Sequence, residues 1–128
     1  MSHSIHDVGV ARQIGAYSDA IETAANLRWL FTAGTPGLST VGDLPPDIAG
    51  QAELAWQHIV RMLDRAGMAV ADIVKVTQYL TRAEDIAAYS KVRKRFLGEV
   101  RPASMLLVNA QLVRPEFLVE VEIVAART

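Results

Sequence analysis

Two carboxylates lie two residues apart in the apolar stretch Val119-Glu120-Val121-Glu122 near the C-terminus. A carboxylate in such a setting can act as a general base that orients a water molecule for attack on an electrophilic carbon. The position equally suits a carboxylate that pairs across a subunit interface, and burial raises its pKa in either case. Glu120 is therefore a candidate catalytic residue with two interpretations of equal weight, and Glu122 is interpreted as structural.

Hydroxyl groups and one glycine are the other groups that could contact a ligand. Tyr17 could donate its hydroxyl, although buried tyrosines usually bond to backbone, and Gly34 could present its backbone amide to an anion from a turn. Ser104 is more typical of a strand residue than of a nucleophile. His58 falls on the polar face of a predicted helix, and the other two histidines lie in the first ten residues, so none is placed to activate that serine.

Composition excludes several classes of protein. The 128 residues are 51% apolar and 21% charged, which fits one folded domain over 1–128 with a loose lead-in over 1–12. A net charge of −1 gives no electrostatic footprint for nucleic acid, and no apolar run is long enough to span a membrane. Because cysteine is absent, disulfides and zinc–thiolate sites are excluded. We expect a cytoplasmic protein without a metal or cofactor.

Apolar spacing and turn residues define the elements that must position these groups. Strands are predicted at 27–33, 72–80, 103–110 and 117–125, and the glycine- and proline-rich segment 34–46 is a loop. A first helix is predicted between a cap at Asp47 and a stop at Gly67. A second helix is predicted to open with a capping box over 81–84 and to end at Gly98.

Helical spacing also predicts which side chains face the core. In the first helix Ile48, Ala52, Ala55, Ile59, Met62 and Ala66 form the apolar face, whereas Gln51, His58, Arg61 and Arg65 face away. In the second helix the inner face is predicted to contain Ile86, Tyr89, Arg93 and Phe96, with the arginine contributing only its aliphatic stem. The basic cluster of this helix, which includes Lys91 and Lys94, is interpreted as solvated.

The last predicted strand shows that the sheet has two partly apolar faces. Phe117, Val119, Val121 and Ile123 alternate to one side, and Leu118, Glu120, Glu122 and Val124 to the other. Two helices cannot cover both faces of a sheet of this size, so they are expected to pack on one face of an α+β domain. The second face then needs a partner, and self-association with closed symmetry is the simplest solution.

Five stretches in order resemble the RidA/YjgF/UK114 family. They are Ile14-Gly15-Ala16-Tyr17-Ser18, Leu30–Pro36 (LFTAGTP), Asp72–Thr77 (DIVKVT), Arg101-Pro102-Ala103-Ser104 and the closing stretch 119–122. The resemblance implies a chorismate-mutase-like fold with a mixed, mainly antiparallel sheet and two helices on one face. It also implies a homotrimer with small-molecule clefts between subunits, and a cofactor-free activity that hydrolyses reactive enamines and imines to keto acids and ammonia.

The same resemblance implies functional residues and one departure. It implies that Glu120 is the catalytic residue and that the substrate-binding residues are Tyr17, Phe31, Gly34, Ser90 and Ser104. Deaminating members carry an arginine after Pro-Ala, which would hold a substrate carboxylate, where this chain has Ser104. Arg101 is considered as a replacement cation.

Because Ser104 carries no charge, we expect weak or absent hydrolysis of imino acids, and a partial gain of hydrolysis in Ser104→Arg. The sequence therefore predicts a trimer that binds a small metabolite between subunits and hydrolyses a reactive enamine or imine without the usual carboxylate-binding arginine. The alternative is a trimer that binds a metabolite or stabilises other components without catalysis.

Overall fold

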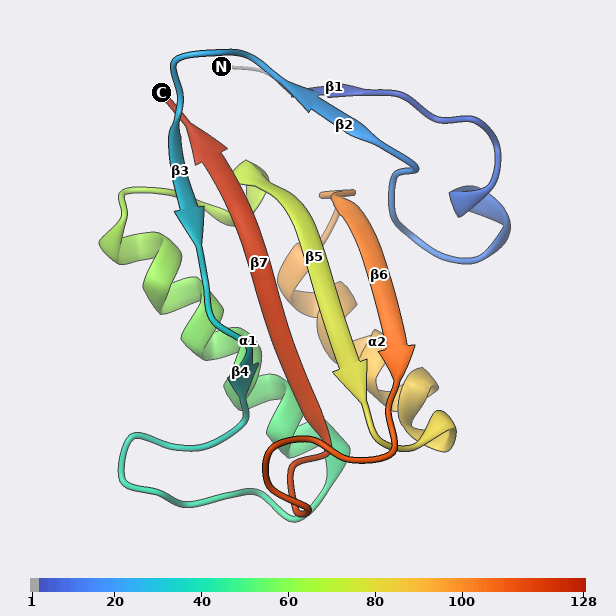
Figure 1. Cartoon of the computed structure of the whole chain (residues 1–128), viewed down its shortest axis with the longest axis vertical. Coiled ribbons are helices and arrows are strands. Elements are labelled where there is room, and N and C mark those ends of the chain that lie inside the picture. The colour runs from blue at the N-terminus through green and yellow to red at the C-terminus, as the bar shows by residue number, and fades with distance from the viewer. Residues whose placement is uncertain (1–2) are drawn as a thin grey trace.

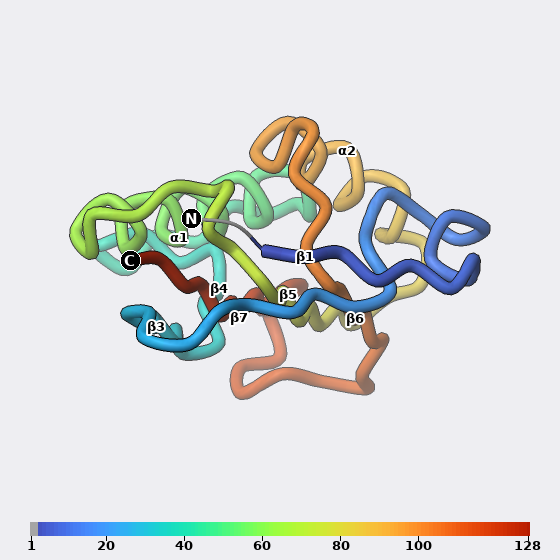
Figure 2. The backbone as a smooth tube through the Cα atoms, turned by 90° about the horizontal axis from the view of Figure 1, so that it is seen from above, coloured from blue at the N-terminus to red at the C-terminus, as the bar shows by residue number. Residues whose placement is uncertain are grey.

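Two helices lie on one face of a sheet, and the opposite face is open (Figures 1 and 2). This computed structural model describes residues 3–128. The main sheet contains, in spatial order, β3 (Arg28–Phe31), β7 (Val119–Arg127), β5 (Ile73–Leu80) and β6 (Ala103–Val108), and β4 (Thr35–Pro36) also pairs with β7. The helices are α1 (Ile48–Arg65) and α2 (Ile86–Leu97). The predicted arrangement of two helices on one face of an α+β sheet is confirmed.

The sheet is mixed, as predicted. Strand β7 pairs antiparallel with β3, β4 and β5, whereas β5 and β6 are parallel. Parallel neighbours need a crossover connection, and α2 provides it between β5 and β6. The observed strands are slightly shorter than predicted at 28–31, 73–80 and 103–108, and the last strand begins and ends two residues later than predicted.

Helix α1 supplies most of the helical contribution to the core. The predicted cap is confirmed, because the Asp47 carboxylate accepts a hydrogen bond from the Gly50 amide at 2.9 Å. Ala52, Ala55 and Ile59 are fully buried against the sheet. Neither α1 nor α2 combines the length and the apolar character that a bilayer-spanning helix needs.

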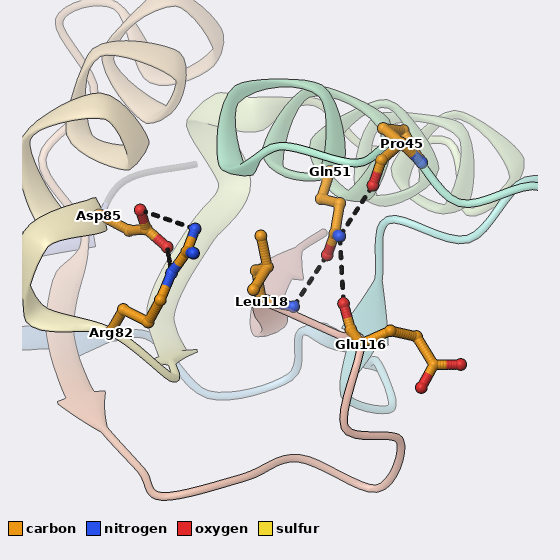
Figure 3. Close-up of polar contacts among 6 residues, drawn as sticks. All are labelled: Pro45, Gln51, Arg82, Asp85, Glu116 and Leu118. Carbon is orange, nitrogen blue, oxygen red and sulfur yellow. Dashed lines mark hydrogen bonds and ion pairs between the residues drawn. The ribbon is translucent and has the colours of Figure 1, made fainter.

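The predicted orientation of Gln51 is wrong. Its side chain is 1% exposed and ties two loops together (Figure 3). The Gln51 amide nitrogen donates to the carbonyl oxygens of Pro45 and Glu116 at 2.9 and 3.3 Å, and its oxygen accepts from the Leu118 amide at 2.9 Å. The buried side-chain amide is stable because backbone groups of the loops form hydrogen bonds with both its nitrogen and its oxygen. These hydrogen bonds also anchor the start of β7.

The predicted capping box over 81–84 is also wrong. A 3-10 turn over Ala83–Asp85 precedes α2, and Arg82 donates two hydrogen bonds to the buried Asp85 carboxylate at 2.8 and 3.2 Å (Figure 3). The inner face of α2 is rotated from the prediction: Tyr89, Val92 and Leu97 are buried, whereas Ile86 is 38% exposed. The ion pair fixes the start of the helix in place of a hydroxyl cap.

The two faces of β7 differ as the alternation predicted. Val119, Val121 and Ile123 are almost fully buried under the helices. Their neighbours Glu120 and Glu122 point to the open face and are only partly buried.

Several large apolar side chains lie exposed on that open face. Trp29 and Phe31 stack there with ring centroids 6.3 Å apart, and Met105 on β6 is also exposed. In the single chain the open face therefore carries apolar side chains beside two carboxylates.

Part of the segment predicted as a lead-in over 1–12 is hydrogen-bonded to the rest of the chain. Within the described residues β1 (His3–Ile5) pairs with β2 (Ile21–Thr23), and residues 1–2 lie outside them. Asp19 accepts hydrogen bonds from the amides of Val8 and Ala11, both at 2.8 Å, and these bonds, that of Val8 foremost, lower its pKa. The carboxylate thus closes the loop between the two strands.

Candidate functional site

Three of the predicted binding residues line one groove. Tyr17, Ser90 and Ser104 come from the N-terminal segment, α2 and β6 respectively, and they surround a cavity of about 490 Å³. The remaining lining residues are Ile14, Gly15, Ile86, Arg93, Met105 and Leu106. This volume suits a small organic ligand, since such pockets are typically about 300–1,000 Å³. We call this site the groove.

Segment 14–18 reaches the groove because it is bonded to the start of β6. The Ser18 amide donates to the Pro102 carbonyl at 3.1 Å, and the Ser18 hydroxyl donates to the Arg101 carbonyl at 2.5 Å. Ser18 also forms an isolated parallel bridge with Ala103. These bonds extend the sheet edge by one residue pair and bring Tyr17 beside Ser104.

Ser104 points toward the helix side of the sheet, where a buried glutamine holds it. In the β5–β6 register Ser104 lies opposite the fully buried Val76. The fully buried Gln78 donates through its amide nitrogen to the Ser104 hydroxyl at 3.0 Å and to the Met105 carbonyl at 2.9 Å. The Ser104 oxygen therefore acts as an acceptor, which leaves its hydrogen available to the groove.

Sequence reasoning missed Gln78 and the role of the Arg93 head group. The Gln78 oxygen accepts from the Tyr89 hydroxyl at 2.7 Å and from the Arg93 guanidinium at 3.3 Å. The signal for Gln78 was its register, because it continues the buried positions Val76 and Leu80 of the same strand. A polar side chain at an apolar position indicates a buried hydrogen-bond network.

Arg101, the proposed replacement cation, does not line the groove. Its guanidinium donates to the carbonyls of Gly98 and Val100 at 2.8 and 3.2 Å, and it lies 3.7 Å from the exposed Glu99 carboxylate. These contacts bind its head group to the loop before β6. Arg93 is the charged residue among those that line the groove.

Two other predicted residues, Gly34 and Glu120, lie at a second place, which we call the corner. Gly34 precedes β4 and Glu120 lies on β7, so close that a Cβ atom on Gly34 would be 2.6 Å from Glu120 Oε1. A side chain at position 34 would therefore displace the carboxylate. Phe31 is 70% exposed on the same open face, opposite Val124.

Burial raises the pKa of the Glu120 carboxyl, and the nearby Glu122 charge raises it further. Tyr79 lies opposite Glu120 in the β5–β7 register and donates a long hydrogen bond of 3.5 Å to Glu122. Within residues 3–128 no group of three or more acidic or histidine side chains is arranged to hold a metal ion. A raised pKa suits a group that takes up and returns a proton.

One chain keeps the groove and the corner apart. Two inter-strand steps separate β6 from β7, since β5 lies between them. Ser104 faces the helices, whereas Glu120 faces the open side of the sheet. The predicted site residues are thus separated: Tyr17, Ser90 and Ser104 line the groove, Gly34 and Glu120 form the corner, and Phe31 lies farther along the open face, opposite Val124.

Comparison with solved structures confirms the fold. The chain resembles a Rid family protein from Yersinia pestis with a TM-score of 0.85 and 22% identity, covering 99% of this chain and all of that one. It also resembles TdcF of E. coli, solved with bound serine, with a TM-score of 0.74 and 28% identity over 90% of this chain and 91% of that one.

Comparison of sequences shows the family. The 2-iminobutanoate/2-iminopropanoate deaminase of Escherichia coli is 27% identical over 131 residues, which cover 99% of each chain. Residues 10–127, nearly the whole sequence, match the family described as endoribonuclease L-PSP. The chain belongs to this family, the RidA/YjgF family.

Proposed function

We propose that this protein binds a small metabolite in a cleft that a second copy of the chain completes, and hydrolyses a reactive enamine or imine there. One observation carries the proposal: the candidate site residues fall into a groove with donors and a corner with a carboxylate, on different faces of one sheet. The similarity to an imine deaminase and to serine-bound TdcF supports the chemistry and the ligand size.

Assembly follows from the open face. Met105 and Leu107 of β6 expose 52% and 37% of their surface on the same face as Glu120 and Glu122 of β7, with β5 between the two strands, and Phe31 exposes 70%. Monomeric proteins seldom leave such side chains together in water, so a second copy is the natural cover. A closed trimer would set the corner of one subunit against the groove of the next, and would form three equivalent clefts.

The proposed reaction needs only water and a proton carrier. Glu120 removes a proton from water as the water oxygen bonds to the imine carbon and the C=N electron pair moves to nitrogen; Glu120 then gives this proton to nitrogen, which yields the neutral carbinolamine. In the second step Glu120 takes the hydroxyl proton as C=O forms and the C–N bond breaks, and passes it to the departing nitrogen, which leaves as ammonia. The balance is imine plus water to ketone plus ammonia, and the raised pKa of Glu120 suits both transfers.

A second function, metabolite binding without catalysis, is favoured by one residue. Ser104 lies where deaminating relatives are expected to place an arginine, and a serine hydroxyl carries no charge. Its oxygen already accepts a hydrogen bond from Gln78, so it offers a ligand one neutral donor. A binder of this kind would retain the groove and the assembly without hydrolysis.

Keto-acid release separates the two functions. An imino acid is generated in situ by an amino-acid oxidase, and its hydrolysis is followed with and without the purified chain while light scattering reports the assembly. The proposed enzyme accelerates keto-acid release, and Glu120→Gln removes the acceleration without changing the assembly. A trimer with no acceleration at any concentration favours the binder, and a monomer at micromolar concentration contradicts both proposals.

A further inference from the structure

We propose that Arg93 of α2 is the specificity-determining cation of the groove, and that it selects a small organic carboxylate in place of an arginine on β6. The inference rests on the proposed function, since it assumes that the groove is the ligand site. Helical spacing predicted only an aliphatic role for Arg93, whereas in the structure this residue lines the groove with Ser90 and Ser104 and its guanidinium bonds to Gln78, which also bonds to Ser104.

A chain of buried groups holds the guanidinium in place. Trp56 donates to the Tyr89 hydroxyl at 3.3 Å, Tyr89 donates to Gln78 at 2.7 Å, and Arg93 donates to the same Gln78 oxygen at 3.3 Å. The Arg93 Cζ atom lies 5.9 Å from the centroid of the Tyr89 ring. Burial raises the pKa of Tyr89, so its hydroxyl stays protonated as a donor. A cation fixed in this way loses little freedom when it binds a ligand.

The charge of Arg93 is not neutralised within the described part of the chain. No carboxylate there lies within 4.0 Å of its guanidinium, whereas the neighbouring Arg95 pairs with Glu53 at 3.3 Å. Arg93 donates one of its five N–H groups to Gln78, so the remaining N–H groups of the guanidinium can bind a planar anion through two parallel hydrogen bonds. Among residues 3–128, no acidic residue lines the groove.

Two hydroxyls complete the recognition. Ser90 lies one helical turn before Arg93, so the two side chains share a face of α2. Ser104 faces them from β6, and its hydrogen is free because its oxygen accepts from Gln78. A carboxylate bound to Arg93 can therefore accept further bonds from serine hydroxyls on two different elements.

The rest of the groove limits the ligand. Ile14, Ile86 and Leu106 provide an apolar wall, and Met105 closes the side toward the open face. A short hydrocarbon group attached to the carboxylate fits this lining better than a second charged group, which would have no partner. The chemical class is thus a short carboxylic acid with an apolar side chain, and 2-oxobutanoate is a test member of it.

The test measures binding of 2-oxobutanoate and of its neutral amide, 2-oxobutanamide, by calorimetry. We expect the wild type to prefer the carboxylate, and Arg93→Gln to lower carboxylate affinity about 10- to 100-fold, the range of a lost charged hydrogen bond. Amide affinity should change less than threefold. Arg93→Lys should fall between, since it keeps the charge and loses the fork. The matched control is Arg95→Gln, which removes the same charge from an exposed position of α2 and should bind like the wild type.

Moving the cation gives a second, independent test. Ser104→Arg alone would place two guanidinium groups in one groove and is expected to weaken binding through unpaired charge. The double variant Arg93→Gln/Ser104→Arg should bind 2-oxobutanoate at least tenfold more tightly than the single variant Arg93→Gln. This revises the gain predicted for Ser104→Arg alone. The circular dichroism and thermal midpoint of each variant establish that it is folded.

Each outcome decides the matter. The proposal is overturned if the wild type binds no 2-oxobutanoate, if it binds the amide as well as the carboxylate, or if Arg93→Gln and Arg95→Gln lose affinity equally. A folded Arg93→Gln with unchanged carboxylate affinity also overturns it. If binding depends on Arg93 but no variant releases keto acid, the hydrolysis proposal fails while this inference stands.

Discussion

The groove and the corner hold their polar groups in different ways. In the groove, Gln78, Tyr89 and Trp56 form a continuous chain of hydrogen bonds that ends on Arg93 and Ser104. At the corner, no donor among the described residues bonds the Glu120 carboxylate, which lies against the bare backbone of Gly34. Fixed donors favour recognition, whereas a less restrained carboxyl with a raised pKa favours proton transfer.

Glu120→Gln should produce the largest effect and separates the two roles. Hydrolysis should fall about 10²- to 10⁴-fold, because an amide cannot accept the proton of water. Affinity for 2-oxobutanoate should stay within about threefold, a difference well below the 1.4 kcal/mol that corresponds to tenfold. Initial rates and calorimetry on the same preparations check both. The control is Glu122→Gln, two residues along, which should retain most of the rate; equal losses in the two variants would remove the distinction between them.

Gln78→Leu tests whether the groove depends on its scaffold. The substitution leaves the Tyr89 hydroxyl and the Arg93 guanidinium without their shared acceptor, and we expect the free energy of unfolding to fall by about 2–3 kcal/mol. Urea denaturation measures this loss. Gln57→Leu, at an exposed position of α1, should change stability by less than about 0.5 kcal/mol. If the two variants were equally stable, the buried network would not stabilise the fold.

Gly34→Ala tests the corner with a smaller change. A methyl group there would meet Glu120 Oε1, and the flexible carboxylate can move away. Stability should therefore change by less than about 1 kcal/mol, while hydrolysis should fall roughly tenfold because the base is displaced. Rate measurements and thermal unfolding report the two quantities separately. A variant with full activity would show that Glu120 need not lie against Gly34.

The pH dependence of stability should show the smallest effect. Since the folded state raises the Glu120 pKa, it binds that proton more tightly than the unfolded chain does. This contribution is present below the usual glutamate value of about 4.3 and is lost as pH rises through the raised value.

Urea midpoints across this range would measure the contribution. Glu120→Gln should flatten the slope, and Glu122→Gln should reduce it in part by removing the second cause of the shift. Parallel profiles for the wild type and Glu120→Gln would contradict the assignment of the slope to Glu120.

Local patterns predicted the elements well, and contacts between elements much less well. The alternation along β7 and the cap at Asp47 follow from neighbouring residues alone, and both are confirmed. Gln51 was misplaced because its partners are backbone groups of two loops, the one just before α1 and another 65 residues away in the sequence. Polarity alone indicates solvent, and only the tertiary structure shows which buried backbone groups need a side-chain partner.

The site shows the same division. The family resemblance predicted that Tyr17, Ser90 and Ser104 would contact a ligand, and the structure places all three around one groove. Arg93 was missed because helical spacing places its Cβ atom on the inner face, which says nothing about where a long side chain ends. The separation of Glu120 from Ser104 depends on which strand lies between them, and that order comes from long-range pairing.

The position of β7 has a consequence for synthesis. This strand follows every other strand of the chain, yet it lies between β3 and β5 and joins them into one sheet (Figure 1). Until residues 119–127 have left the ribosome, β3 and the β5–β6 pair have no common partner, and each exposes an unpaired edge. Folding of the nascent chain should therefore be complete only after its C-terminal strand emerges. Chains stalled before Val119 should be protease-sensitive, whereas chains extended by a C-terminal linker, so that Arg127 clears the ribosome, should be resistant.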